Sequence, residues 1–74
     1  MAKQKQSSDS VYKVTEIIGT SAKSWDDAAK NAIETASGTL RDLRIAEVVK
    51  MDVKINDGAL EYRTRLQLSL KYGS

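Results

Sequence analysis

The C-terminal segment Glu61–Tyr72, EYRTRLQLSLKY, alternates apolar and polar residues without a break. This alternation is typical of a β-strand with one buried face, and the segment is about twice the usual strand length. Its apolar side carries Tyr62, Leu66, Leu68, Leu70 and Tyr72, and its polar side carries Arg63, Arg65, Gln67 and Lys71. A chain of 74 residues must find cover for this long apolar stripe, which limits the folds open to it.

Two further strands are predicted upstream. Val11–Gly19 is rich in β-branched residues, and Leu43–Ile55 alternates again, with Ile45 in its apolar row. Residues 56–58, Asn-Asp-Gly, suit a tight hairpin turn between the second and third strands. A sheet order of one-three-two then makes every neighbouring pair antiparallel and the crossover right-handed.

A helix is predicted between the first two strands. Ser24 is a favourable N-cap residue, and Asp27 stands where the acidic member of a capping box belongs. Apolar residues then recur with helical spacing from Trp25 to Leu40, with fraying expected after Ser37. The predicted fold class is α+β, in the order β-α-β-β, with a three-stranded antiparallel sheet partly wrapped around one helix.

The lengths of these elements predict an oligomer. A helix of about sixteen residues is roughly 24 Å long, whereas strands of about twelve residues reach roughly 40 Å. The helix cannot cover such strands, and its apolar side is mostly alanine, so the exposed ends of the stripe need cover from other copies. Trp25, at the start of the helix, is interpreted as a core or interface anchor in preference to a cofactor-stacking residue.

Composition narrows the chemistry. The chain has no Cys and no His, which excludes disulfides, thiolate ligands and the commonest general base, and no catalytic constellation is found. Enzymatic activity is therefore not expected. Glu16, Glu47 and Asp52 offer oxygen ligands to a hard cation, but without EF-hand spacing, so the metal ligands stay undetermined.

Charge and hydropathy indicate the surroundings. Residues 1–10 are predicted to be a disordered tail, and residues 11–72 the folded domain. The tail carries +1 of the net charge of +2, so the folded part is close to neutral, which disfavours nucleic-acid binding. No apolar segment is long enough to cross a membrane and no signal peptide is evident, so a cytoplasmic location is expected.

The basic side of the last strand leaves two interpretations open. Arg63, Arg65 and Lys71 can bind phosphate, or they can form a solvated face with cross-strand partners. Those partners would come from the second strand: Arg44, Glu47, Lys50 and Asp52.

Several motifs resemble the dodecin family over residues 11–72. They are YKV followed by IIGTS and SW, the alanine-rich helix, LRDLR before AEVV, and the closing Y-x-x-x-L strand. The resemblance implies twelve copies that close into a hollow sphere, with flavin bound on the cavity side of the sheet. It also implies a flavin-stacking Trp at the position of Ile45 and a hydrogen-bonding Gln at the position of Arg63.

This chain departs from that pattern at both positions. Ile45 has no aromatic face, and Arg63 has donors only. The pair resembles the calcium dodecin branch, which lacks the flavin pair and is associated with Ca²⁺. The leading interpretation is therefore a homododecamer that sequesters a small ligand or ion, with calcium a candidate and flavin disfavoured. Two alternatives are a flavin-storage dodecin with a degenerate site, and a nucleic-acid module that uses Arg63, Arg65 and Lys71.

Overall fold

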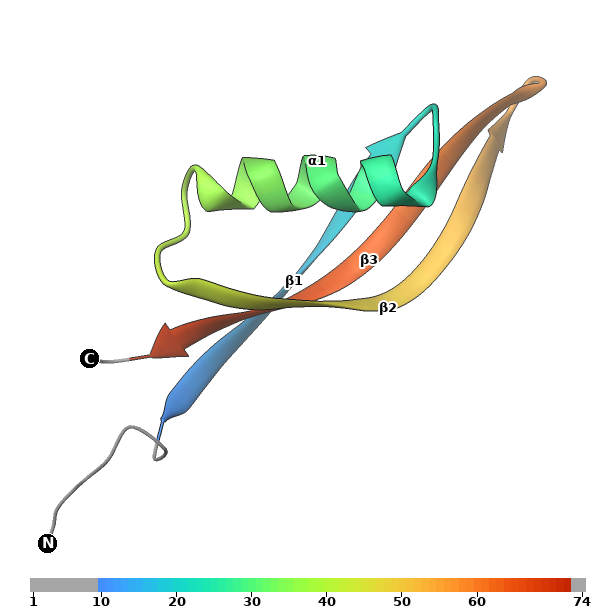
Figure 1. Ribbon diagram of the computed structural model, residues 1–74. Coiled ribbons are helices and arrows are strands. Elements are labelled where there is room, and N and C mark those ends of the chain that lie inside the picture. Colours follow the sequence, from blue (N-terminus) through green and yellow to red (C-terminus); the bar gives the residue numbers. More distant parts are fainter. Residues whose placement is uncertain (1–9, 73–74) are drawn as a thin grey trace, which may run out of the picture.

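The computed structural model describes residues 10–72, so residues 1–9 of the predicted tail lie outside it. Its elements are β1 (Val11–Ser21), α1 (Trp25–Ser37), β2 (Leu43–Asn56) and β3 (Ala59–Tyr72). The strands form one sheet in the order β1-β3-β2, with both pairs antiparallel. The helix lies across one face of this sheet, and the β2–β3 hairpin extends past it (Figure 1). The predicted fold class and strand order are confirmed.

The start of α1 is fixed by three side chains. The Ser24 hydroxyl accepts a hydrogen bond from the Asp27 main-chain N–H at 3.0 Å, as the capping pattern predicts. The Asp27 carboxylate, however, accepts from the Ser21 hydroxyl at 2.7 Å, at the end of β1. The acid that was expected to reach back to the N-cap therefore ties the helix to the preceding strand.

The helix is shorter than expected, and the strands are longer. Helix α1 has 13 residues, or about 20 Å, because it ends at Ser37, while β2 and β3 have 14 residues each, or about 46 Å. The expected length of about sixteen residues was wrong, but the helix does end at Ser37, where fraying was expected. Thr39 and Leu40 lie outside the helix and donate from their main-chain N–H groups to the Ala36 oxygen. The mismatch between helix and sheet is therefore larger than the sequence predicted.

A small core lies between α1 and the sheet. Its buried hydrophobic residues are Ala28, Ala32, Ala36, Leu66 and Leu68. Alanine lets the helix lie close to β1, and Gly19 lies where the two meet. A Cβ atom at Gly19 would collide with the main-chain oxygen of Ala28 and would lie 2.7 Å from the Cβ of Ala32. Glycine is therefore required at this position.

Two irregularities in β2 change the faces of its side chains. The register shifts between Leu43 and Ile45, and again between Val48 and Lys50. Directly paired residues of antiparallel strands share a face, so Ile45, opposite Ser69, lies on the side of the sheet away from α1. The prediction that Ile45 shares one apolar row with Leu43 was wrong, because unbroken alternation does not survive a bulge.

The helix-facing side of β2 is left uncovered. Leu43 is the one residue of β2 that packs against the core cluster. Farther along, Val48, Met51 and Ile55 are 49%, 56% and 75% exposed, although they pair with helix-facing residues of β3. In residues 10–72, α1 is neither long enough nor apolar enough to span a membrane.

Candidate functional site

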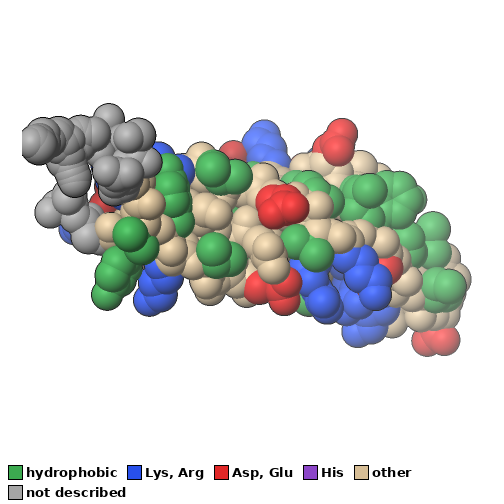
Figure 2. All heavy atoms as spheres, turned by 90° about the horizontal axis from the view of Figure 1, so that it is seen from below, with side chains coloured by type: hydrophobic (Ala, Val, Ile, Leu, Met, Phe, Trp, Pro, Cys, Tyr) green, Lys and Arg blue, Asp and Glu red, His purple; other side chains and the backbone are tan. Residues whose placement is uncertain are grey.

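The sheet face away from α1 carries most of the residues that the sequence singled out. We call this side of the sheet the distal face. The register places its side chains in rows that run across the strands. Three successive rows are Glu16–Gln67–Glu47, Ile18–Arg65–Lys50 and Thr20–Arg63–Asp52. Figure 2 views the molecule from this side and shows Lys and Arg side chains gathered towards the hairpin end, with acidic side chains beside them.

Arg63 is held by a bidentate ion pair with Asp52. Its Nε and Nη2 donate to the two carboxylate oxygens at 2.7 and 2.8 Å. The two residues are directly opposite on β3 and β2, so the sheet itself sets the geometry of the pair. One of the predicted cross-strand partners of Arg63 is thus confirmed. With both oxygens engaged, Asp52 is poorly placed to act as the cation ligand that the sequence allowed.

This ion pair shifts the ionisation of both partners. The hydrogen bonds from Arg63 lower the pKa of the Asp52 carboxyl below its ordinary value, and the positive charges of Arg63, Lys50 and Arg65 act in the same direction. The carboxylate in turn raises the pKa of Arg63. Asp52 is therefore a carboxylate surrounded by three cations.

The next row brings two cations face to face. Arg65 on β3 lies directly opposite Lys50 on β2 and opposite Ile18 on β1. These three residues, with Asp52 and Arg63, line a small depression in the distal face. Within residues 10–72 the ion pairs are Arg63–Asp52 and Arg44–Asp42, so neither Lys50 nor Arg65 has a carboxylate within ion-pairing distance.

Ile45 and Arg63 are not brought together in one chain. Ile45 is 54% exposed and lies opposite Ser69, whereas Arg63 lies six residues earlier along β3. That spacing is about 20 Å at roughly 3.4 Å per residue. Within one chain, a ligand that touches both side chains would have to span that distance.

The remaining candidates are spread along the same face. Lys71 lies opposite Tyr12 near the end of the sheet, far from Arg63. Glu16 and Glu47 flank Gln67 on neighbouring strands. No group of three or more acidic residues that could hold a metal ion occurs in residues 10–72. The row Arg63, Arg65 and Lys71, treated as one basic stripe in the sequence, is therefore interrupted by acidic neighbours.

Asp52 also links the distal face to the helix. The indole Nε1–H of Trp25 donates a hydrogen bond to the main-chain oxygen of Asp52 at 2.9 Å. The Trp25 ring meets Tyr62 edge-on, with ring centroids 5.1 Å apart. Trp25 keeps 37% of its surface exposed. It therefore packs at the rim of the core. The sequence offered Asp52 as a cross-strand partner of Arg63, but it gave no sign of the contact between Asp52 and Trp25.

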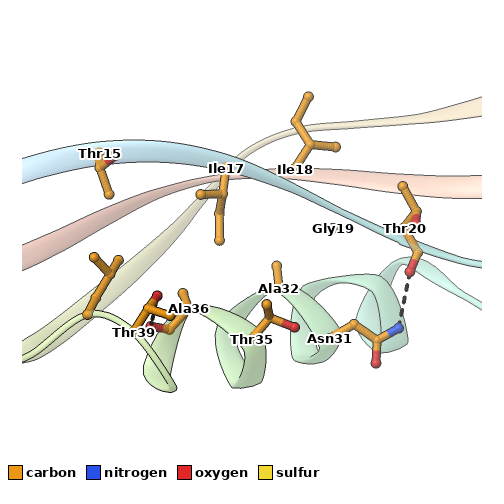
Figure 3. Close-up of a pocket in the computed structure, with 11 residues that line it drawn as sticks. Thr15, Ile17, Ile18, Gly19, Thr20, Asn31, Ala32, Thr35, Ala36 and Thr39 are labelled. Atoms are coloured by element: carbon orange, nitrogen blue, oxygen red, sulfur yellow. Dashed lines mark hydrogen bonds between the residues drawn. The ribbon is translucent and has the colours of Figure 1, made fainter.

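A second concave feature lies on the helix side. A groove of about 530 Å³ runs between α1 and the outer edge of β1. Ile17, Ala32 and Ala36 point into it (Figure 3). At one end, Asn31 Nδ2 donates a hydrogen bond to the main-chain oxygen of Thr20 at 3.1 Å. Its lining combines apolar residues with four threonines and Asn31, and it contains no charged side chain.

Comparisons with known proteins give a consistent set of relatives. A model of the dodecin family matches residues 11–72. The calcium dodecin of Mycobacterium tuberculosis is 43% identical over 63 residues, covering 84% of this chain and 89% of that protein. A crystal structure of that protein, described as a calcium-chelating antigen with a novel calcium-binding site, superposes with a TM-score of 0.78 at 41% identity, covering 85% and 91% of the two chains. The dodecin of Streptomyces coelicolor superposes with a TM-score of 0.82 at 37% identity, covering 90% and 97%.

Proposed function

Because this chain belongs to the dodecin family, we propose that it closes into a hollow shell of twelve copies that binds a small ligand or ion on the distal face of its sheet. The proposed role is binding and sequestration, without catalysis. The observation that carries the proposed assembly is the uncovered apolar side of β2, which one copy of the chain does not bury.

The distribution of apolar surface supports the proposed assembly. The helix packs against parts of β1 and β3, while Val48, Met51 and Ile55 of β2 stay about half-exposed or more. At the other side of the helix, the groove along β1 offers an uncharged, partly apolar surface. Contacts between such different patches of successive copies are heterologous, and they close into rings when the rotation between copies allows it.

The ligand is expected to bind without the aromatic stacking that dodecins give to flavin. Ile45 supplies no ring, which forfeits about 1–3 kcal/mol per stacked base by analogy with nucleic-acid stacking. Arg63 has no acceptor, and its guanidinium is already paired with Asp52. A flavin bound here would have neither the stacking partner nor the amide partner of the family pattern.

Calcium is the ion that we test first, because the relative from Mycobacterium tuberculosis is a calcium dodecin. Ca²⁺ takes six to eight oxygen ligands. Residues 10–72 of one chain do not fit that need, since they contain no cluster of three or more acidic side chains. A calcium site would therefore have to combine oxygens from several copies. In the central rows of the distal face, Glu16 and Glu47 are the carboxylates that make no ion pair within residues 10–72.

The nucleic-acid alternative receives less support. Acidic side chains lie in the rows next to Arg63 and Arg65, and Asp52 neutralises Arg63 directly. A phosphate backbone would meet these carboxylates along with the cations, which weakens the electrostatic attraction on which such binding depends.

The test is the composition of the purified particle. The full chain is purified without added metal or flavin, its absorption spectrum is recorded, and its metal content is measured by mass spectrometry before and after dialysis against calcium. We expect no flavin absorption bands and a fixed ratio of calcium to chain after dialysis. A yellow protein with a flavin spectrum would instead support flavin storage, and a particle that retains neither calcium nor flavin would contradict both roles.

A further inference from the structure

The pair Lys50–Arg65 has a feature that the proposed function does not explain. The two cations are directly opposite on adjacent strands, and like charges in that arrangement destabilise a sheet. The nearest carboxylate along the strands towards the hairpin, Asp52, is occupied on both oxygens by Arg63. Together with Arg63 and Asp52 the group carries two uncompensated positive charges beside the exposed side chain of Ile18.

We propose that Lys50 and Arg65 form a binding site for a phosphate group on the distal face. The Arg65 guanidinium offers a planar pair of donors that matches two phosphate oxygens, and the Lys50 ammonium offers a point charge from the neighbouring strand. Side chains of directly paired residues start about 5 Å apart, so both can reach one phosphate. This site goes beyond the proposed function, because it takes an anion and does not depend on the number of copies in the particle.

The Arg63–Asp52 pair limits the site on one side. Since Asp52 holds Arg63 through two hydrogen bonds, Arg65 keeps its own donors free for the ligand. On the other side lie Glu16 and Glu47, one row away, and their charges repel an anion that moves towards them. The site is thus restricted to a small phosphate-bearing anion centred on a single row of the sheet.

Two other kinds of partner for the cations predict different results. Glu16 and Glu47 lie diagonally across from the row, at a spacing that long side chains can bridge. A neighbouring copy could also supply a carboxylate. In the first case the two cations stabilise the isolated fold, and in the second they hold the particle together.

The experiment is calorimetric titration of the purified, phosphate-free particle with sodium pyrophosphate. It compares the unaltered chain with Lys50→Gln, Arg65→Gln and the conservative Arg65→Lys. Lys30→Gln is the matched control, because it removes the same charge from an exposed position on α1, on the opposite side of the sheet. Parallel titrations with orthophosphate and with phenyl phosphate distinguish an inorganic anion from an organic phosphate ester.

We expect saturable binding that Lys50→Gln and Arg65→Gln each weaken at least tenfold, with an intermediate loss for Arg65→Lys and less than a twofold change for Lys30→Gln. In phosphate-free buffer, Lys50→Gln should not lower the melting temperature more than Lys30→Gln does. Absence of binding at millimolar pyrophosphate, or an equal loss in the control, would overturn the proposal. So would a selective fall in melting temperature or in particle mass for Lys50→Gln, since the cations would then be paired within or between copies.

Discussion

The indole of Trp25 and the main-chain carbonyl of Asp52 are joined by a hydrogen bond of 2.9 Å across the sheet edge. The carboxylate of the same aspartate holds Arg63 on the opposite face. One residue of β2 therefore connects the start of the helix with the face proposed to bind the ligand. A substitution at Trp25 or at Arg63 should therefore disturb the contacts of the other residue as well.

The Trp25 contact can be divided into its polar and apolar parts. Trp25→Phe keeps a ring against Tyr62 but removes the Nε1–H donor, so it should cost about 0.5–1.5 kcal/mol of unfolding free energy. Trp25→Ala also removes the packing, and should cost towards the lower end of about 3–5 kcal/mol, because 37% of the residue is exposed. Denaturant unfolding measures both values. Equal losses for the two substitutions would show that the ring contributes no packing.

The Arg63–Asp52 pair should make stability depend on acid pH. The folded-state pKa of Asp52 is lowered, so the carboxylate stabilises the fold above its unfolded pKa of about 3.9, and this contribution is lost as the pH falls through the lower folded value. Asp52→Asn should therefore be less stable than the unaltered chain by a constant amount above about pH 5, and the gap should narrow below about pH 4.

Thermal unfolding of both proteins from pH 7 to pH 2.5 measures this gap. Asp57→Asn is the control, because its side chain lies in the β2–β3 turn and makes no ion pair within residues 10–72. A gap that stays constant down to the lowest pH would mean that the pair does not hold Asp52 ionised.

Gly19 should be the least tolerant position of β1. Gly19→Ala places a methyl group against the Ala28 oxygen and the Ala32 side chain, so α1 must move away from the sheet. Overpacking typically costs about 1–3 kcal/mol, and a clash with backbone places this substitution at the upper end. Gly38→Ala is the matched control, since its Cβ would meet Thr35 at 3.4 Å in a helical conformation. Similar melting temperatures for the two variants would contradict the close approach of α1 to β1.

Flavin binding should be recoverable at Ile45. Ile45→Trp restores an aromatic face at an exposed position and should strengthen riboflavin binding while quenching its fluorescence. Adding Arg63→Gln should bring the total gain above about tenfold, or 1.4 kcal/mol. Because the two positions are about 20 Å apart in one chain, coupling between the substitutions would report a ligand shared between copies. Ile55→Trp, at the hairpin end of β2, is the control, and an equal gain there would show that the pocket lies elsewhere.

Local chemistry made much of the fold predictable. The helix start at Ser24 and the hairpin turn could be predicted because each depends on a few adjacent residues. Asp57 and Gly58 do adopt the positive φ angles that the turn requires. The strand order followed from the antiparallel pairing of three strands around one crossover.

Features that depend on register were not predictable in the same way. The register shifts of β2 place Ile45 on the distal face and set Lys50 opposite Arg65. The sequence shows that the alternation is interrupted near Val48, but it does not say at which residue the register shifts. The pairing of Arg63 with Asp52 in preference to Glu47 likewise depends on register, as does the contact of Trp25 with Asp52.

The mass of the particle tests the proposed assembly most directly. Sedimentation equilibrium of the full chain at micromolar concentration should give a single species of about 98 kDa, which is twelve times the mass of the 8.2 kDa chain. The uncovered side of β2 gives the physical reason, because Met51 and Ile55 need cover that the chain itself does not provide. A folded, stable monomer of about 8 kDa at that concentration would contradict the proposed shell of twelve copies.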